Sequence, residues 1–95
     1  MVAAYNEPPY KYVHIAGAAT TTIKSGQGIL HAININTPAT GNISVFDNTA
    51  GSGTTIAIIN STTSVFPETL IYDTGFSVGL TLITQAGQDI TVSYS

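Results

Sequence analysis

Along most of this chain, every second residue in a short run is apolar, and small polar residues occupy the alternate positions. A period of two is typical of β-strands with one buried face, whereas an amphipathic helix repeats every three to four residues. The runs are rich in Thr, Val and Ile, which suit a pleated, half-buried surface. Segments containing Gly, Pro, Asn or Asp separate them. The pattern therefore predicts an all-β protein of antiparallel strands.

The spacing of these breakers predicts about eight short strands. We expect them at Tyr10–Ala16, Ala19–Lys24, Ile29–Thr37, Asn42–Asp47, Thr54–Asn60, Val65–Tyr72, Phe76–Thr84 and Asp89–Tyr94. Pro67 interrupts the sixth run, so its beginning should lie at a sheet edge or in a bulge. Asp73-Thr74-Gly75 should form the turn that follows the sixth strand, because Asp and Gly both favour turns.

The alternation also predicts which side chains form the core. In the third strand, Ile29, His31, Ile33 and Ile35 share one face, and we expect that face to be buried. In the later strands the inward residues should be Ile43, Val45, Ile56, Ile58, Phe76, Val78, Leu80, Leu82, Ile90, Val92 and Tyr94.

A chain of 95 residues is the length of one domain. We predict a single antiparallel β-sandwich over residues 10–95, for which a jelly roll is one suitable form, preceded by an extended N-terminal arm at residues 1–9. The prolines of the arm prevent regular strand pairing. Aromatic and proline residues near the arm form a candidate interface with a neighbouring subunit: Tyr5, Pro8, Pro9, Tyr10 and Tyr12. The alternative, that they fold back on their own sandwich, is equally open.

Charge is scarce, and this limits the possible partners. Charged residues make up 7% of the chain, against about 25% in an average soluble domain. The net charge is −3, with Lys11 and Lys24 as the only strong cations, so we expect neither nucleic-acid binding nor attraction to anionic membranes. There is no cysteine for a disulfide, and neither an apolar run of membrane-spanning length nor the features of a signal peptide. We therefore expect synthesis and assembly in the cytoplasm.

One triplet resembles an active-site motif. Asp73-Thr74-Gly75 follows three apolar residues, as in aspartic proteases, and the chain has about the length of one subunit of a dimeric protease. In that family, however, the triplet lies in the first third of the subunit and needs a flap and a later apolar segment, whereas only twenty residues follow it here. We regard a dimeric aspartic protease as an unlikely alternative and the triplet as a turn.

Other candidate chemistry is sparse. His14 and His31 are the only histidines, and neither occurs in a metal-ligand spacing, so we expect His31 to be a hydrogen-bonded core or interface residue. No Gly-x-Ser-x-Gly motif is present. Asp47 and Asn48 supply too few oxygens for Ca²⁺. We therefore predict that the protein is not an enzyme and uses no metal or cofactor.

Several longer segments resemble small β-rich virion proteins of tailed bacteriophages. They are the strand ending Ile-Lys followed by Ser-Gly-x-Gly, the Leu-His strand ending Asn-Thr-Pro, the hairpin containing Asp-Asn-Thr-Ala, and the closing Asp-Ile-Thr-Val-Ser-Tyr. The resemblance begins near residue 20 and covers about three-quarters of the chain. It implies a structural virion protein, either a head decoration (cement) protein or a head-fibre module, that is assembled in the host cytoplasm.

The resemblance implies a homotrimer that binds the major capsid protein, or another virion protein, and stabilises the phage head. The alternative is a fibre or tail-tip module that binds a receptor or glycan through loops such as 48–53. Uncharged edge strands also favour assembly, since few residues other than Lys11, Lys24 and Pro67 discourage edge pairing.

Overall fold

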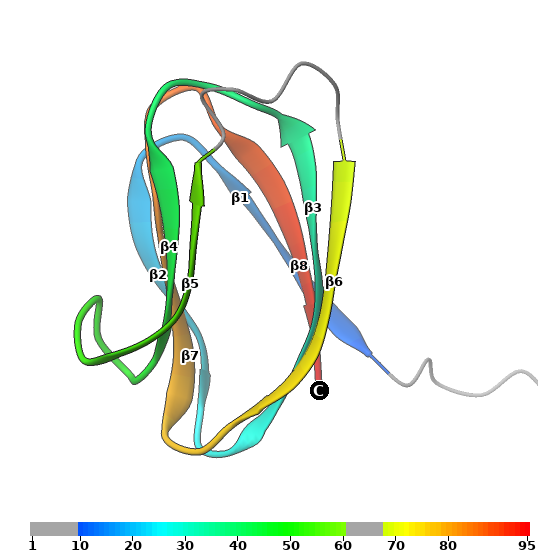
Figure 1. Ribbon diagram of the computed structural model, residues 1–95, viewed down its shortest axis with the longest axis vertical. Coiled ribbons are helices and arrows are strands. Elements are labelled where there is room, and N and C mark those ends of the chain that lie inside the picture. The colour runs from blue at the N-terminus through cyan, green and yellow to red at the C-terminus, as the bar shows by residue number, and fades with distance from the viewer. Residues whose placement is uncertain (1–9, 61–67) are drawn as a thin grey trace, which may run out of the picture.

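The computed structural model describes residues 10–60 and 68–95, which form an all-β sandwich (Figure 1). Its strands are β1 (Lys11–Ala16), β2 (Ala19–Ser25), β3 (Gly28–Thr37), β4 (Asn42–Asp47), β5 (Thr54–Asn60), β6 (Glu68–Phe76), β7 (Gly79–Thr84) and β8 (Asp89–Tyr94). Within these residues, no helix is long and apolar enough to span a membrane. The predicted fold class is confirmed, and three of the predicted strands, the fourth, fifth and eighth, have the expected bounds.

Two four-stranded sheets face each other across the core (Figure 1). Sheet A has the strand order β1-β8-β3-β6, and sheet B has the order β2-β7-β4-β5. All neighbouring strands are antiparallel. This is the strand order of an eight-stranded jelly roll, which is built from two Greek keys.

The core is apolar. It is formed by side chains that are at most 5% exposed: Ile15, Leu30, Ile33, Ile35, Ile43, Val45, Phe76, Leu80, Leu82, Ile90 and Val92. Of the central strands, β4, β7 and β8 contribute core residues at alternate positions, as the period of two predicts. No buried side-chain nitrogen or oxygen lacks a hydrogen bond among the described residues.

A bulge in β3 overturns part of the predicted core. The pairing of β3 with both of its neighbours shifts register between Leu30 and Ala32. As a result, Leu30 is buried and Ile29 is 44% exposed, so the prediction that Ile29 and His31 point into the core is wrong. The extra residue reverses the alternation, which is why Ile33 and Ile35 are nevertheless buried.

A second bulge overturns the prediction for β5. In its pairing with β4, Ala57 lies opposite Val45 and Thr55 lies opposite Phe46. Ile56 therefore has no partner residue on β4 and forms the bulge. Beyond the bulge, Ala57 and Ile59 pack against the core and Ile58 points outward, 54% exposed. Ile58 was predicted to be a core residue, and this is wrong.

The Asp73-Thr74-Gly75 triplet is not a turn. It lies within β6, where Thr74 pairs with Leu30 and Gly75 with Ile29. The chain turns instead at residues 77–78, so Val78 is 53% exposed rather than buried. Asp73 still adopts the left-handed conformation expected near a turn, with φ of 48°, but it does so next to the register shift of β3.

Some predictions lie outside the described residues. These are the extended arm at residues 1–9, with Tyr5, Pro8 and Pro9 of the candidate interface, and the edge or bulge expected at Pro67.

Candidate interaction surface

His31 lies at the centre of a cluster on the outer face of sheet A. Its Nδ1 is 2.5 Å from Oδ1 of Asp73 on β6. The ring of Tyr10 stacks on the imidazole with centroids 4.0 Å apart and planes inclined by 6°. Tyr10 precedes β1, so its side chain reaches across β8 to the third strand of the sheet. His31 was predicted to be a hydrogen-bonded core or interface residue, and the hydrogen bond is present.

The local sequence explains this cluster. The β3 bulge places His31 outside the core next to β6, and Asp73 is one of the few non-glycine residue types that readily adopt a left-handed conformation. The two backbone irregularities bring the imidazole and the carboxylate together. In the alternation of the sequence alone, His31 falls on the buried face, so this contact was not predictable.

A second histidine–aspartate pair lies on the same face. Nε2 of His14 is 2.7 Å from Oδ1 of Asp89, which also accepts a hydrogen bond of 2.9 Å from the Asn36 amide. The hydrogen bonds from Asn36 and His14 lower the pKa of the Asp89 carboxyl. Since both aspartates on this face are bonded to a histidine, neither presents an unpaired carboxylate to a partner.

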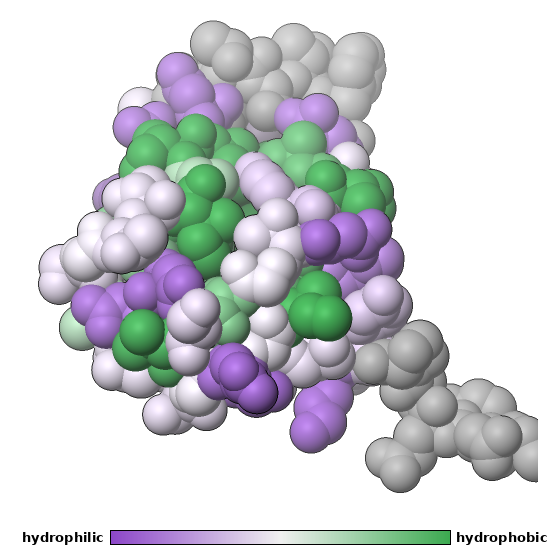
Figure 2. Space-filling model, turned by 60° about the horizontal axis from the view of Figure 1, so that its bottom comes forward, coloured by the Kyte–Doolittle hydropathy of each residue, from purple (hydrophilic) through white to green (hydrophobic). Residues whose placement is uncertain are grey.

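Between these pairs, the face is uncharged and partly apolar. One row across the sheet consists of Tyr12, Ser93, Ala32 and Ile71, which pair in turn from β1 to β6. Tyr12 is 74% exposed and Ile71 is 61% exposed, whereas the residues between them are small. We call Tyr12, Ile29 and Ile71, together with the Tyr10–His31 stack, the sheet A patch. Figure 2 shows one face of the molecule, where apolar residues form separate patches between pale, weakly polar ones.

Part of the outer face of sheet B is covered by its own chain. The 48–53 loop between β4 and β5 lies against β7, where the Thr81 hydroxyl donates a 2.8 Å hydrogen bond to the Asn48 carbonyl. Thr81 is fully buried although it lies between the core residues of its strand. Within the loop, the Asn48 amide donates to the Ser52 carbonyl at 2.7 Å. The polar groups of this loop therefore hold it in place.

Asp47 fixes one end of the sandwich. Its carboxylate accepts hydrogen bonds from the backbone N–H groups of Ser77, Val78 and Gly79, at 2.8 to 3.3 Å. The bonds from Ser77 and Val78 lower the pKa of Asp47 most. Through these hydrogen bonds, Asp47 connects the end of β4 to the β6–β7 turn. Hydrogen bonds from backbone N–H groups to an ionised carboxylate are stronger than those to a neutral acceptor.

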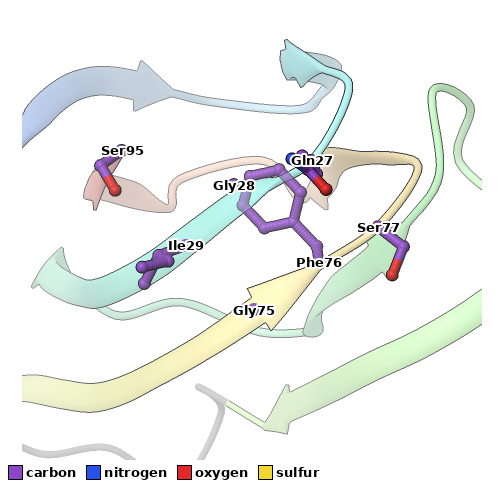
Figure 3. Close-up of a pocket in the computed structure, with 7 residues that line it drawn as sticks. All are labelled: Gln27, Gly28, Ile29, Gly75, Phe76, Ser77 and Ser95. Atoms are coloured by element: carbon purple, nitrogen blue, oxygen red, sulfur yellow. The ribbon is translucent and has the colours of Figure 1, made fainter.

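A shallow pocket of about 560 Å³ lies at the same end (Figure 3). It is lined by Gln27, Gly28, Ile29, Gly75, Phe76, Ser77 and Ser95. The Phe76 ring lies beside Gly28, where a Cβ would come within 2.7 Å of it. None of the lining side chains is ionisable, and the nearest amino group is that of Lys24, which would lie 3.0 Å from a Cβ on Gly28.

No cluster of three or more His, Cys, Asp or Glu residues able to hold a metal occurs in residues 10–60 and 68–95. The two histidine–aspartate pairs lie on an open face, one with Tyr10 stacked on its histidine and the other with Asn36 bonded to its aspartate. The surface offers an open area over which another molecule could make contact.

Of the predicted interface residues, the structure places Tyr10 and Tyr12 on one sheet face. Tyr10 stacks on a residue of its own domain, as the fold-back alternative proposed, whereas Tyr12 is open to a partner. Sequence analysis assigned Ile29 to the wrong face, because the β3 bulge decides it, and assigned no face to Ile71.

Comparisons with protein-family models, curated proteins and solved structures found no match.

Proposed function

We propose that the protein is a structural component of a virion, a decoration protein that binds and stabilises the head of a tailed bacteriophage. The observation that carries the proposal is the sheet A patch, in which Tyr12 and Ile71 are exposed on a face whose aspartates are both bonded to histidines. Burying such a face costs little, because few charges lose water. Exposed tyrosine is also typical of interface anchors.

The position of the patch supports a contact that includes the N-terminal residues. Tyr10, whose ring lies on this face, directly follows residues 1–9. A partner bound over the patch would therefore meet the chain where those residues join the domain. The jelly-roll order is compatible with this role, since viral capsid proteins use the fold, although the fold alone does not define a function.

The mechanism is surface burial in many copies. The partner would be the major capsid protein or another virion protein, and a self-associated decoration protein would contact several neighbouring capsid subunits. Contacts of modest individual affinity then combine, because each additional bond forms within an assembly that is already joined. No catalytic step is part of this role.

The test is sedimentation with heads of the phage that encodes the chain. Wild-type protein should sediment with heads, and Ile71→Lys and Tyr12→Ser should each raise the dissociation constant by at least about tenfold. Val78→Lys is the matched control, because Val78 is similarly exposed at 53% but lies outside the patch. The proposal fails if the wild type stays in the supernatant or if all variants bind equally.

A deletion of residues 2–9 tests the expected contribution of the N-terminal residues. The shortened protein should unfold at the same denaturant concentration as the full chain but occupy fewer positions on the heads. Unchanged occupancy would remove these residues from the contact.

A further inference from the structure

Each sheet ends in two edge strands whose outer backbone groups face away from the sheet. In sheet A these are β1 and β6, and in sheet B they are β2 and β5. Within the described residues, β5 pairs with β4 alone. Such an edge presents a row of N–H and C=O groups that can pair with another strand.

The four edges differ in charge. Strand β1 carries Lys11, β2 carries Lys24, and β6 carries Glu68 and Asp73. Strand β5, Thr-Thr-Ile-Ala-Ile-Ile-Asn, contains neither a charged residue nor proline. Charged residues and prolines are two of the devices that keep edge strands apart, and β5 is the one edge of the four with neither.

We infer that β5 is a self-association edge, which pairs antiparallel with β5 of a second copy and joins the two B sheets into one continuous sheet. A second copy fits better than an unrelated strand with charged residues, because two identical uncharged strands bring no charge into the contact. The residues also have high β-propensity, being β-branched at most positions.

Ile58 identifies the centre of the contact. It points to the outer face of sheet B opposite Ser44 and is 54% exposed, unlike the core-facing Ala57 and Ile59. The bulge at Ile56 interrupts the first half of the strand, which leaves the second half regular. A two-fold axis at Ile58 would place the two Ile58 side chains directly opposite each other, about 5 Å apart at Cβ.

Antiparallel pairing of identical strands is isologous and gives an even number of copies. It therefore disagrees with the homotrimer that the resemblance to decoration proteins implies. The inference does not depend on what the sheet A patch binds, because β5 lies in the other sheet.

Cysteine cross-linking tests the contact, since the chain contains no cysteine. Ile58→Cys should form a disulfide-linked dimer under mild oxidation. Val78→Cys is the matched control, because Val78 is 53% exposed in the wild type, and it should not form the dimer. A result in which both variants cross-link equally, or neither does at protein concentrations up to about 1 mM, would overturn the inference.

Light scattering coupled to gel filtration gives the second readout. The wild type should reach the mass of a dimer, and Ile58→Lys should weaken the dimer at least about a hundredfold, because both copies lose a buried isoleucine and gain facing charges. Val78→Lys should remain dimeric. A trimer, or a dimer that Ile58→Lys leaves intact, contradicts the inference.

These results are separable from those of the virion proposal. Ile58→Lys should change the mass in solution but leave the patch intact, whereas Ile71→Lys should change binding to heads and leave the mass unchanged. If Ile58→Lys leaves the mass unchanged, the self-association proposal fails. If Ile71→Lys leaves binding to heads unchanged, the virion proposal fails.

Discussion

The outer faces of the two sheets are used in different ways. On sheet B, the 48–53 loop folds over β7 and buries Thr81 through hydrogen bonds to its own chain. On sheet A, no described loop does this, and Tyr12 and Ile71 stand exposed between two histidine–aspartate pairs. Thr, Ser, Asn and Ile occur on both faces, and sheet A also carries tyrosines and the two histidine–aspartate pairs.

The difference is the one expected if the charge-poor face of sheet B is stabilised in part by its own chain and, under the proposed function, that of sheet A by a partner. A face closed by its own loop should tolerate few substitutions, because they disturb packing that the folded chain needs. A face kept for a partner should tolerate many, and they should change binding instead. This contrast makes predictions for matched residues on the two sheets.

The largest effect should come from Gly79→Ala under the loop. A Cβ there would lie 2.8 Å from the Lys24 carbonyl oxygen and 3.0 Å from that of Asn48, both of which are backbone atoms. We expect a loss of about 2–3 kcal/mol in the free energy of unfolding, measured by urea titration. The control is Gly75→Ala on sheet A, where the nearest atom to a Cβ would be the Gly28 carbonyl oxygen at 3.8 Å. Equal losses in both variants would contradict the contrast.

Next in size should be Thr81→Val, which keeps the shape of a fully buried side chain but removes its hydroxyl. The Asn48 carbonyl would lose its 2.8 Å donor, and the Thr22 hydroxyl its 3.0 Å partner. Unfolding should become easier by about 1–2 kcal/mol. Thr69→Val, on the exposed side of β6, should change stability by less than about 0.5 kcal/mol. A stabilised Thr81→Val variant would show that the loop is not held by this hydroxyl.

Much of the fold could be predicted from the sequence, because alternation and turn residues are local signals. Ile43, Val45, Ile90 and Val92 are buried as their alternation requires. The bulges could not be predicted in this way, since one extra residue in β3 or β5 depends on how neighbouring strands pair. For the same reason, Ile29, Ile58 and the His31–Asp73 contact were missed.

A smaller effect should depend on pH. Hydrogen bonds from backbone N–H groups lower the pKa of Asp47 from its ordinary value of 3.8, so its unfolded form binds a proton more readily than its folded form. The stabilisation is complete above pH 3.8 and is lost as the pH falls through the lower, folded pKa. Asp47→Asn should lower the urea midpoint of unfolding at pH 7. In this variant the midpoint should also fall less between pH 7 and pH 3 than it does in the wild type. If the midpoint of the variant falls as much as that of the wild type, Asp47 is not the source of the acid dependence.

The smallest effect on stability should follow from Tyr12→Ser combined with Ile71→Ser. Both side chains are mostly exposed, so the unfolding free energy should change by less than about 0.5 kcal/mol. Thermal unfolding followed by circular dichroism would measure this. A large destabilisation would mean that the sheet A patch serves the fold of this chain and not a partner.

The most direct test of the central claim, that sheet A is the face in contact with other virion protein, is photo-cross-linking inside assembled particles. A photoreactive phenylalanine analogue would be placed at position 71 on sheet A or at position 78 on the β6–β7 turn. We predict cross-links to another virion protein from position 71 and few or none from position 78. Cross-links from position 78 alone, or from neither position in particles that contain the protein, would contradict the account.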